Sequence, residues 1–255
     1  MNSGVVSSIF SFPPSRLRWD THSLIYYDTY KALVARQPEF EKFIKLKEIF
    51  KYDGAYGPDR LWMKGERATS ESYYNPMNGQ GGALKQIIRH YSEAKERMIN
   101  NLPWAKDFTW MSHFVVDVLS PSHHFGHKIK PRKKYRDWED PYFHRINPAS
   151  LRNRHMIFEA MINGWQIFGR RFKPKFEELE KIRGEEVSEF IRKTVDKVRA
   201  LGLYEEFLER GFNRRLWHRV NEELIPKIDY ALGVVWWCLM RETAEGKRDD
   251  KKLSV

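Results

Sequence analysis

The chain has 255 residues, of which 41% are hydrophobic and 15% aromatic, and this is the composition of an ordinary globular protein with a substantial core. Its single cysteine excludes an internal disulfide framework, so the core must be stable without covalent cross-links. The formal net charge of +11 favours anionic partners such as phosphate esters, nucleic acid or acidic lipid headgroups, but by itself it does not distinguish among them.

The N-terminal sequence MNSGVVSSIFSF contains neither a basic segment nor a long apolar one. It therefore lacks the features of a signal peptide and of a membrane span. We predict a soluble, cytoplasmic protein with one domain over residues 1–255, whose ends at 1–15 and 245–255 are flexible.

Apolar residues recur at intervals of three and four through most of the chain, and no segment shows the alternation of a strand. The pattern predicts an all-α, multi-helix bundle. Asp20 or Thr21 would cap the first helix, Pro38 would stand in the first turn of the second, and Pro121 would end or kink the fourth. The predicted helices cover residues 22–37, 39–51, 84–98, 104–120, 150–168, 176–201 and 225–243.

Two long irregular stretches interrupt this pattern. Residues 52–82 are rich in Gly, Pro, Asn and Ser, and residues 121–148 contain the basic sequence KIKPRKKYRDW. Loops of this length within a compact domain often carry function. The basic sequence could be a solvated loop, which is the usual role of a charge run, or it could bind nucleic acid or make peripheral contact with an anionic membrane.

Two predicted helices each carry an imidazole and a carboxylate four residues apart, as His113 with Asp117 and as His155 with Glu159. This spacing puts both side chains on one helix face, and His123 follows where the chain can turn back. Such a pair alone is more often an ordinary surface pair. The neighbours of His113 and Asp117 are almost all apolar, however, and an unpartnered buried carboxylate is costly. Because zinc and similar ions take imidazole and carboxylate ligands, the pattern predicts a metal site between facing helices.

The other histidines carry a weaker signal. His124 and His127 are predicted to lie behind the metal ligands or on the surface. His90, His144 and His218 have charged neighbours, so we predict that they are solvated.

The order His113, Asp117, His123, with a proline two residues before the last histidine, resembles the HYLGDxxQPxH-type signature of the bacterial zinc-dependent phospholipase C family and of its relatives, the fungal single-strand-specific zinc nucleases. The resemblance extends along nearly the whole chain, through THSLIYYDTYKAL, GAYGPD, YYNPMNG and HMIFE in the family's order. It implies an all-helical domain of the phospholipase C/nuclease type with one to three zinc ions.

The resemblance also implies a role for each matching residue. His123, His155 and Glu159 would complete one zinc site together with a water. His113 and Asp117 would supply a second site, and His22 with a bridging Asp117 a third. The implied metal ligands are therefore His22, His113, Asp117, His123, His155 and Glu159. Asp59 in GPDR would match the family's general base.

Two positions depart from the family. Ser72 stands where the family has a further histidine ligand, and His90, His124 or a carboxylate such as Glu71 could take its place. The family also uses an N-terminal tryptophan as a ligand, whereas this sequence begins well upstream of His22.

These observations predict a metal-dependent hydrolase of phosphate esters, with phospholipase C-like cleavage of a phosphodiester by metal-bound hydroxide. The substrate would be a phospholipid headgroup or nucleic acid. One alternative is a zinc-dependent nuclease with the same metal core. Another is a non-catalytic relative that keeps a structural zinc. The sequence leaves the oligomeric state open.

Overall fold

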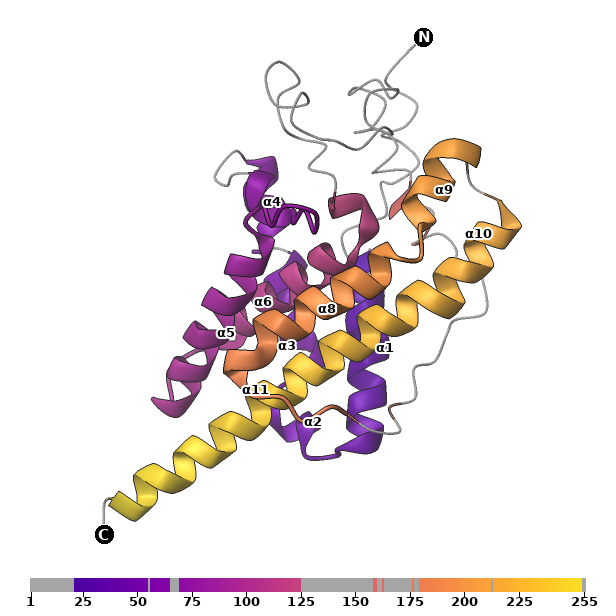
Figure 1. Cartoon of the computed structure of the whole chain (residues 1–255). Helices are drawn as coiled ribbons and strands as arrows, with labels where there is room; N and C mark the ends of the chain where they lie inside the picture. The colour runs from indigo at the N-terminus through magenta and orange to yellow at the C-terminus, as the bar shows by residue number, and fades with distance from the viewer. Residues whose placement is uncertain are drawn as a thin grey trace.

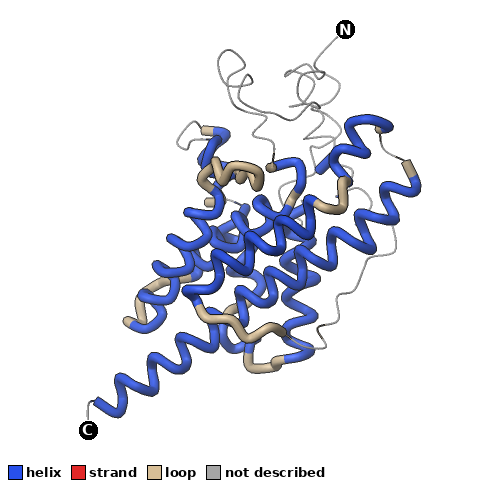
Figure 2. The backbone as a smooth tube through the Cα atoms, viewed as in Figure 1, coloured by secondary structure: helices blue, strands red, loops and turns tan. Residues whose placement is uncertain are grey.

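The computed structural model of the chain describes residues 21–54, 56–64, 69–124, 158–159, 162, 176, 179–211 and 213–253. Within these ranges the all-α prediction is confirmed, because helices and turns account for the backbone and no β-strand is present (Figure 2). An isolated antiparallel bridge joins Tyr74 and Gly81. His155, His127, His144 and the basic sequence at 128–138 lie outside the described residues.

The described helices are α1 (Thr21–Arg36), α2 (Phe40–Phe43), α3 (Leu46–Gly54), α4 (Pro58–Met63), α5 (Ala83–Ile99), α6 (Ala105–Leu119), α8 (Val187–Arg199), α9 (Leu203–Arg210), α10 (Arg214–Arg219) and α11 (Ile225–Leu253). Short 3-10 turns occur at η1 (Thr69–Ser72), η2 (Pro121–His123) and η5 (Gly184–Glu186), and a π-helical turn, η6 (Val220–Leu224), leads into α11. Figure 1 shows α11 running diagonally across the molecule, with α8 beside it and α1 behind.

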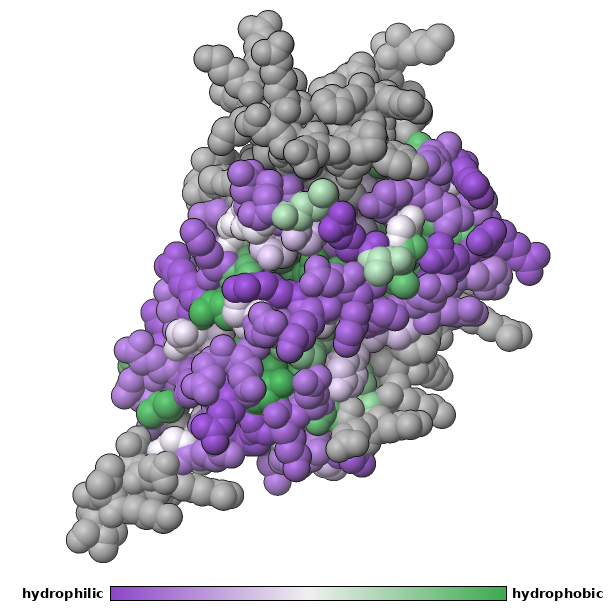
Figure 3. All heavy atoms as spheres, in the orientation of Figure 1, coloured by the Kyte–Doolittle hydropathy of each residue, from purple (hydrophilic) through white to green (hydrophobic). Residues whose placement is uncertain are grey.

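Helix α6 lies at the centre of the bundle, in contact with α1, α3, α5, α8 and α11. Its sequence is apolar on almost every side, and a helix of that kind is buried on all faces. Trp236 from α11 is fully buried against it and donates a hydrogen bond from Nε1 to Ser112 Oγ, at 2.7 Å. The exterior face in Figure 3 is mainly hydrophilic, with small separate hydrophobic areas.

The helix predicted over 39–51 is divided in two. Ile44 has an extended backbone, with φ −145° and ψ 147°, and it ends α2 before α3 begins at Leu46. The side chain of Ile44 is buried, and its carbonyl accepts a hydrogen bond from the Tyr30 hydroxyl at 3.1 Å. This contact with α1 holds the chain out of helical geometry, although the local sequence favours a helix.

The helix predicted over 176–201 begins only at Val187. Gly184 accounts for part of the delay, because its N–H donates to Glu242 Oε1 at 2.7 Å and its Cα faces the Tyr91 ring with no room for a Cβ. Three further differences concern segments predicted to be irregular or not predicted at all. The stretch 52–82 contains α4 and η1, helices α9 and α10 follow α8, and α11 continues through Leu253 into the tail predicted to be flexible.

None of the described helices is both long enough and apolar enough to cross a bilayer.

Candidate metal centre

Asp117 lies at the middle of the candidate site, and its side chain is 1% exposed. Its Oδ1 lies 3.1 Å from His22 Nε2 and 3.5 Å from His123 Nε2. Its Oδ2 lies 3.3 Å from His113 Nε2. One buried carboxylate therefore faces three imidazoles, which come from α1, α6 and η2.

Local structure explains how these three imidazoles meet. His22 stands in the first turn of α1, and His113 lies one turn before Asp117 on the same face of α6, as their spacing predicted. Pro121 ends α6, and Ser120, which has an extended conformation, leads from α6 into the turn η2. The backbone N–H of His123 then donates to the Ser120 carbonyl at 2.9 Å, which returns His123 to the site.

Two of the imidazoles are oriented by acceptors outside the site. His123 Nδ1 lies 2.7 Å from the Ser72 carbonyl oxygen, and because a carbonyl can only accept, Nδ1 carries the hydrogen. His113 Nδ1 lies 3.0 Å from Asp53 Oδ1, which also accepts from the Tyr26 hydroxyl at 3.2 Å. Both rings are thereby fixed with Nε2 toward Asp117. Metal-binding histidines show this arrangement, with one nitrogen held by an outer acceptor and the other free to ligate.

Asp53 reaches His113 because α3 packs on α6. The turn after α3 brings Gly57 against the Asp53 carbonyl oxygen, which a Cβ at position 57 would overlap. The same turn starts α4 at Pro58 and places Asp59 in its first turn. Asp59 Oδ1 lies 3.6 Å from His113 Nε2, and its side chain is 64% exposed, so Asp59 occupies the solvent side of the site.

Glu159 completes the described part of the site. Its Oε1 lies 2.8 Å from His123 Nε2, and its backbone carbonyl accepts from Thr21 Oγ1 at 3.3 Å. The side chain of Glu159 is 30% exposed, whereas that of His123 is 9% exposed. The site is therefore closed around Asp117 and open toward Asp59 and Glu159.

The electrostatics of the site would suit a bound cation. Burial lowers the pKa of His22 and the nearby His113 lowers it further, but the hydrogen bond and charge of Asp117 outweigh both and raise it to about 9. Burial also lowers the pKa of His113, yet Asp117 and Asp59 raise it well above its usual value. The imidazole rings of His22 and His113 are stacked, with an interplanar angle of 5° and 4.2 Å between their centroids. Two protonated imidazoles in that position would repel each other, whereas two ligated imidazoles are neutral.

Two buried atoms at the centre have no hydrogen-bond partner among the described residues. These atoms are His113 Nε2 and Asp117 Oδ2. A cation bound between them would satisfy both, and imidazole nitrogen and carboxylate oxygen are ligands that divalent first-row metals accept. In addition, His22, Asp59 and His113 each offer a ligand atom within 4.8 Å of the others. The residues present are thus positioned to hold a metal ion.

The structure brings together five of the predicted ligands and the predicted general base, while His155 lies outside the described residues. The five ligands are His22, His113, Asp117, His123 and Glu159, and Asp59 stands beside them. The contacts of Asp53 and of the Ser72 carbonyl were not predicted, because no spacing in the sequence relates either residue to α6. The position of Asp53 just before the GPD sequence was the one available signal for it.

One prediction about the other histidines is corrected. His90 was predicted to be solvated, but it is 3% exposed and its Nδ1 lies 3.1 Å from Asp107 Oδ1, in a separate cluster with Glu93. His124, predicted to lie behind the metal ligands or on the surface, is buried, and its Nε2 is occupied because it donates to the Val118 carbonyl at 2.9 Å. Burial, together with the charges of His123 and Arg199, lowers the pKa of His124 to about 4, although that hydrogen bond acts to raise it. His218 is half-exposed, in agreement with the prediction.

Comparison with known proteins gives no identification. No protein-family model matches the chain, and no curated protein matches it in sequence. The resemblance to the zinc-dependent phospholipase C family therefore stays a prediction, carried by the order of the motifs.

Proposed function

We propose that the chain is a zinc-dependent hydrolase of phosphate esters that cleaves phosphodiesters in the manner of the zinc-dependent phospholipase C family. The observation that carries this proposal is the convergence of three imidazole Nε2 atoms on the buried carboxylate of Asp117. Outer acceptors hold two of these rings in the tautomer that a metal ligand requires. A structural zinc site would need the same convergence of ligands but not the open side.

Each residue of the site has a task in this proposal. The residues that would hold one to three zinc ions are His22, His113, Asp117, His123 and Glu159, with His155 as the sixth ligand expected from the sequence. Bound zinc would lower the pKa of a water molecule and offset the negative charge on the phosphate oxygens. Asp59, exposed at the open side, would accept a proton from the attacking water as general base. The leaving group would be an alcohol.

The test combines metal content with turnover. The protein is stripped with a chelator and reloaded with zinc, the bound ions are counted by elemental mass spectrometry, and hydrolysis of bis(p-nitrophenyl) phosphate is measured. We expect activity to disappear on stripping and to return with zinc. His123→Ala and Glu159→Ala should each lower the activity by about two orders of magnitude or more, because metal-assisted charge stabilisation contributes several kcal/mol.

His218→Ala is the matched control, since His218 lies on α10 and is half-exposed. It should retain the activity of the unaltered protein. Hydrolysis that ignores both chelation and the two site variants would contradict the proposal. A rise in melting temperature on zinc binding, with no turnover above the Glu159→Ala background, would instead favour a non-catalytic protein with a structural zinc.

A further inference from the structure

A second cluster of side chains that can ligate a metal lies between α5 and α6, which run side by side (Figure 1). It consists of His90 and Glu93 on α5 and of Asp107 in the first turn of α6. Each of these side chains offers one ligand atom, and the three atoms lie within 4.8 Å of one another. We call this group the His90 cluster; it shares no residue with the candidate metal centre.

One imidazole nitrogen faces two carboxylates in the His90 cluster. His90 Nδ1 lies 3.1 Å from Asp107 Oδ1 and 3.2 Å from Glu93 Oε2. Ligand atoms arranged tetrahedrally at about 2.0–2.1 Å from a zinc ion lie about 3.3 Å from one another. The two observed distances are therefore close to those within the coordination shell of one ion, which could bind the nitrogen and both oxygens at once.

Guanidinium groups hold both carboxylates from the outside. Arg97 Nε lies 3.1 Å from Asp107 Oδ2, and Arg89 Nε donates to Glu93 Oε1 at 2.8 Å. Each arginine thus takes one oxygen of a carboxylate and leaves the other oxygen facing His90. Outer partners of this kind orient the carboxylates that bind metals. The arginines also offset part of the negative charge, so we expect the cluster to bind a divalent ion less tightly than the candidate metal centre does.

The imidazole of His90 is buried, and it packs against the rings of Trp110 and Phe114. Its other nitrogen, Nε2, is also buried and has no hydrogen-bond partner among the described residues, so no contact there holds the hydrogen on Nδ1. A hydrogen on Nδ1 can point at only one of the two carboxylate oxygens. A divalent ion in its place would bind both.

The His90 cluster is accessible from solvent through a hollow of about 480 Å³. All three residues of the cluster line this hollow. Glu93 is the most accessible of them, because its side chain is 34% exposed whereas His90 and Asp107 are buried. An ion could therefore enter from solvent, and water could supply the ligands that the protein does not.

We propose that the His90 cluster is a metal site apart from the candidate metal centre, which binds a divalent transition-metal ion through His90 Nδ1, Glu93 Oε2 and Asp107 Oδ1. One imidazole with two carboxylates suits zinc or manganese. The ring of Phe114 packs against the imidazoles of both His90 and His113, so the site adjoins the candidate metal centre without sharing a ligand with it. The proposal is independent of the proposed function and goes beyond it.

The test counts the zinc ions that the full chain binds. Stripped protein is dialysed against a series of free zinc concentrations, and the zinc per chain is measured by elemental mass spectrometry. Glu93→Gln removes a charged ligand, so one of the bound ions should need at least about tenfold more free zinc to load. His90→Gln removes the imidazole and should have the same effect. Hydrolysis of bis(p-nitrophenyl) phosphate should be unchanged in both variants.

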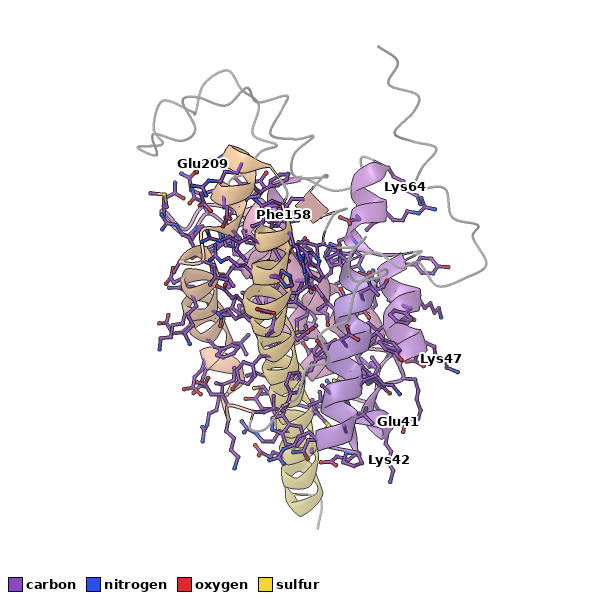
Figure 4. The ribbon with its side chains drawn as sticks, turned by 90° about the vertical axis from the view of Figure 1, so that its right-hand side faces the viewer. Glu41, Lys42, Lys47, Lys64, Phe158 and Glu209 are labelled. Atoms are coloured by element: carbon purple, nitrogen blue, oxygen red, sulfur yellow. The ribbon has the colours of Figure 1, made fainter. Side chains whose placement is uncertain are left out.

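Glu96→Gln and Glu209→Gln are the controls for lost charge. Glu96 is exposed on α5, the helix of His90 and Glu93, and Glu209 is exposed on α9, at the edge of the bundle in Figure 4. Both controls should load zinc as the unaltered protein does. If the buried substitution His90→Gln does not fold, as judged by circular dichroism, the partly exposed Glu93 carries the test.

The inference and the proposed function can fail separately. Zinc loading of Glu93→Gln and His90→Gln equal to that of the controls would overturn the second site, whether or not the chain hydrolyses the diester. Loss of hydrolysis together with the ion would also contradict it, because the ion would then belong to the candidate metal centre. An ion that depends on Glu93, in a chain without hydrolytic activity, would support the second site and refute the hydrolase.

Discussion

At the scale of single residues, the candidate centre depends on groups that do not themselves face the metal. Asp53 and the Ser72 carbonyl each bind the Nδ1 hydrogen of one imidazole, and they thereby decide which nitrogen faces Asp117. Asp53 is in turn fixed by the Tyr26 hydroxyl. The geometry at the centre is therefore set one layer further out, by residues of α1, α3 and η1.

Asp53→Asn tests this layer. The substitution keeps the size of the side chain but removes the negative charge beside the His113 N–H, and the amide can present its NH2 group as well as its oxygen, so the ring is no longer held in one tautomer. We expect the affinity for zinc to fall by about tenfold or more, measured by competition with a chromophoric chelator. Glu48→Gln, on the same helix but exposed, removes an equal charge and should leave the affinity unchanged. Equal zinc affinity in the two variants would mean that Asp53 does not position His113.

Residue spacing brought together only residues whose relation is local, whereas His22 and Asp59 were expected at the site from the family resemblance. His113 and Asp117 share a face because they are four apart on one helix, and His123 follows a proline that must end that helix. Asp53 was missed because its contact with His113 spans 60 residues and exists only once α3 packs on α6. The prediction that His90 is solvated was wrong for a similar reason. Its sequence neighbours are charged, but its imidazole packs against Phe114 and is buried.

At the scale of elements, local pattern predicted where the helices lie, whereas long-range contacts made several predicted boundaries incorrect. Helices α1, α5 and α6 follow their apolar periodicity almost to the residue. The break at Ile44 and the late start of α8 have causes elsewhere in the molecule, namely the Tyr30 hydroxyl and the side chains around Gly184. Periodicity therefore located the helices, and contacts between helices decided where several of them end.

The contact between α1 and α11 contains a buried carboxyl group that predicts a pH dependence. Asp229 is fully buried on α11; Thr29 Oγ1 donates to its Oδ1 at 3.0 Å, and its Oδ2 has no hydrogen-bond partner among the described residues. Burial raises the pKa of Asp229 well above its usual value, and the negative charge of Asp28 raises it further. The folded chain therefore binds this proton more tightly than the unfolded chain does.

Asp229→Asn replaces the titrating carboxyl group with an amide, so this position no longer makes the free energy of unfolding depend on pH. Because the folded-state pKa is raised, the free energy of unfolding of the unaltered protein should fall as pH rises above about 4, by up to about 1.4 kcal/mol per pH unit. Asparagine keeps the acceptor for Thr29 without the buried charge. Denaturant unfolding in chelator should therefore show the variant gaining on the unaltered protein between pH 5 and 8. A difference that is constant over that range would contradict the assignment, and the exposed Asp196→Asn on α8 is the control.

At the scale of the whole molecule, the net charge of the chain contrasts with the carboxylates gathered at the candidate centre. The chain carries a net charge of +11, while the candidate centre gathers Asp53, Asp59, Asp117 and Glu159 around three imidazoles. A positive net charge favours the approach of phosphate esters, and the carboxylates gathered at the centre favour a metal ion. The positive net charge and the carboxylates of the centre are compatible, because the first attracts an anionic phosphate ester and the second attract a metal cation.

The stability of the whole chain should therefore depend on zinc, and the dependence should change with pH. Zinc at about 100 times its dissociation constant would raise the free energy of unfolding by about 2.7 kcal/mol, provided that it binds only the folded chain. The ligands must lose their protons to bind it, and the pKa of His22 is raised to about 9 by Asp117 against the effects of burial and of His113. At a fixed zinc concentration, the rise in melting temperature relative to chelator should accordingly be larger at pH 8 than at pH 6. Magnesium, which prefers oxygen ligands, should produce little shift at either pH, and an equal response to both ions would exclude an imidazole-rich site.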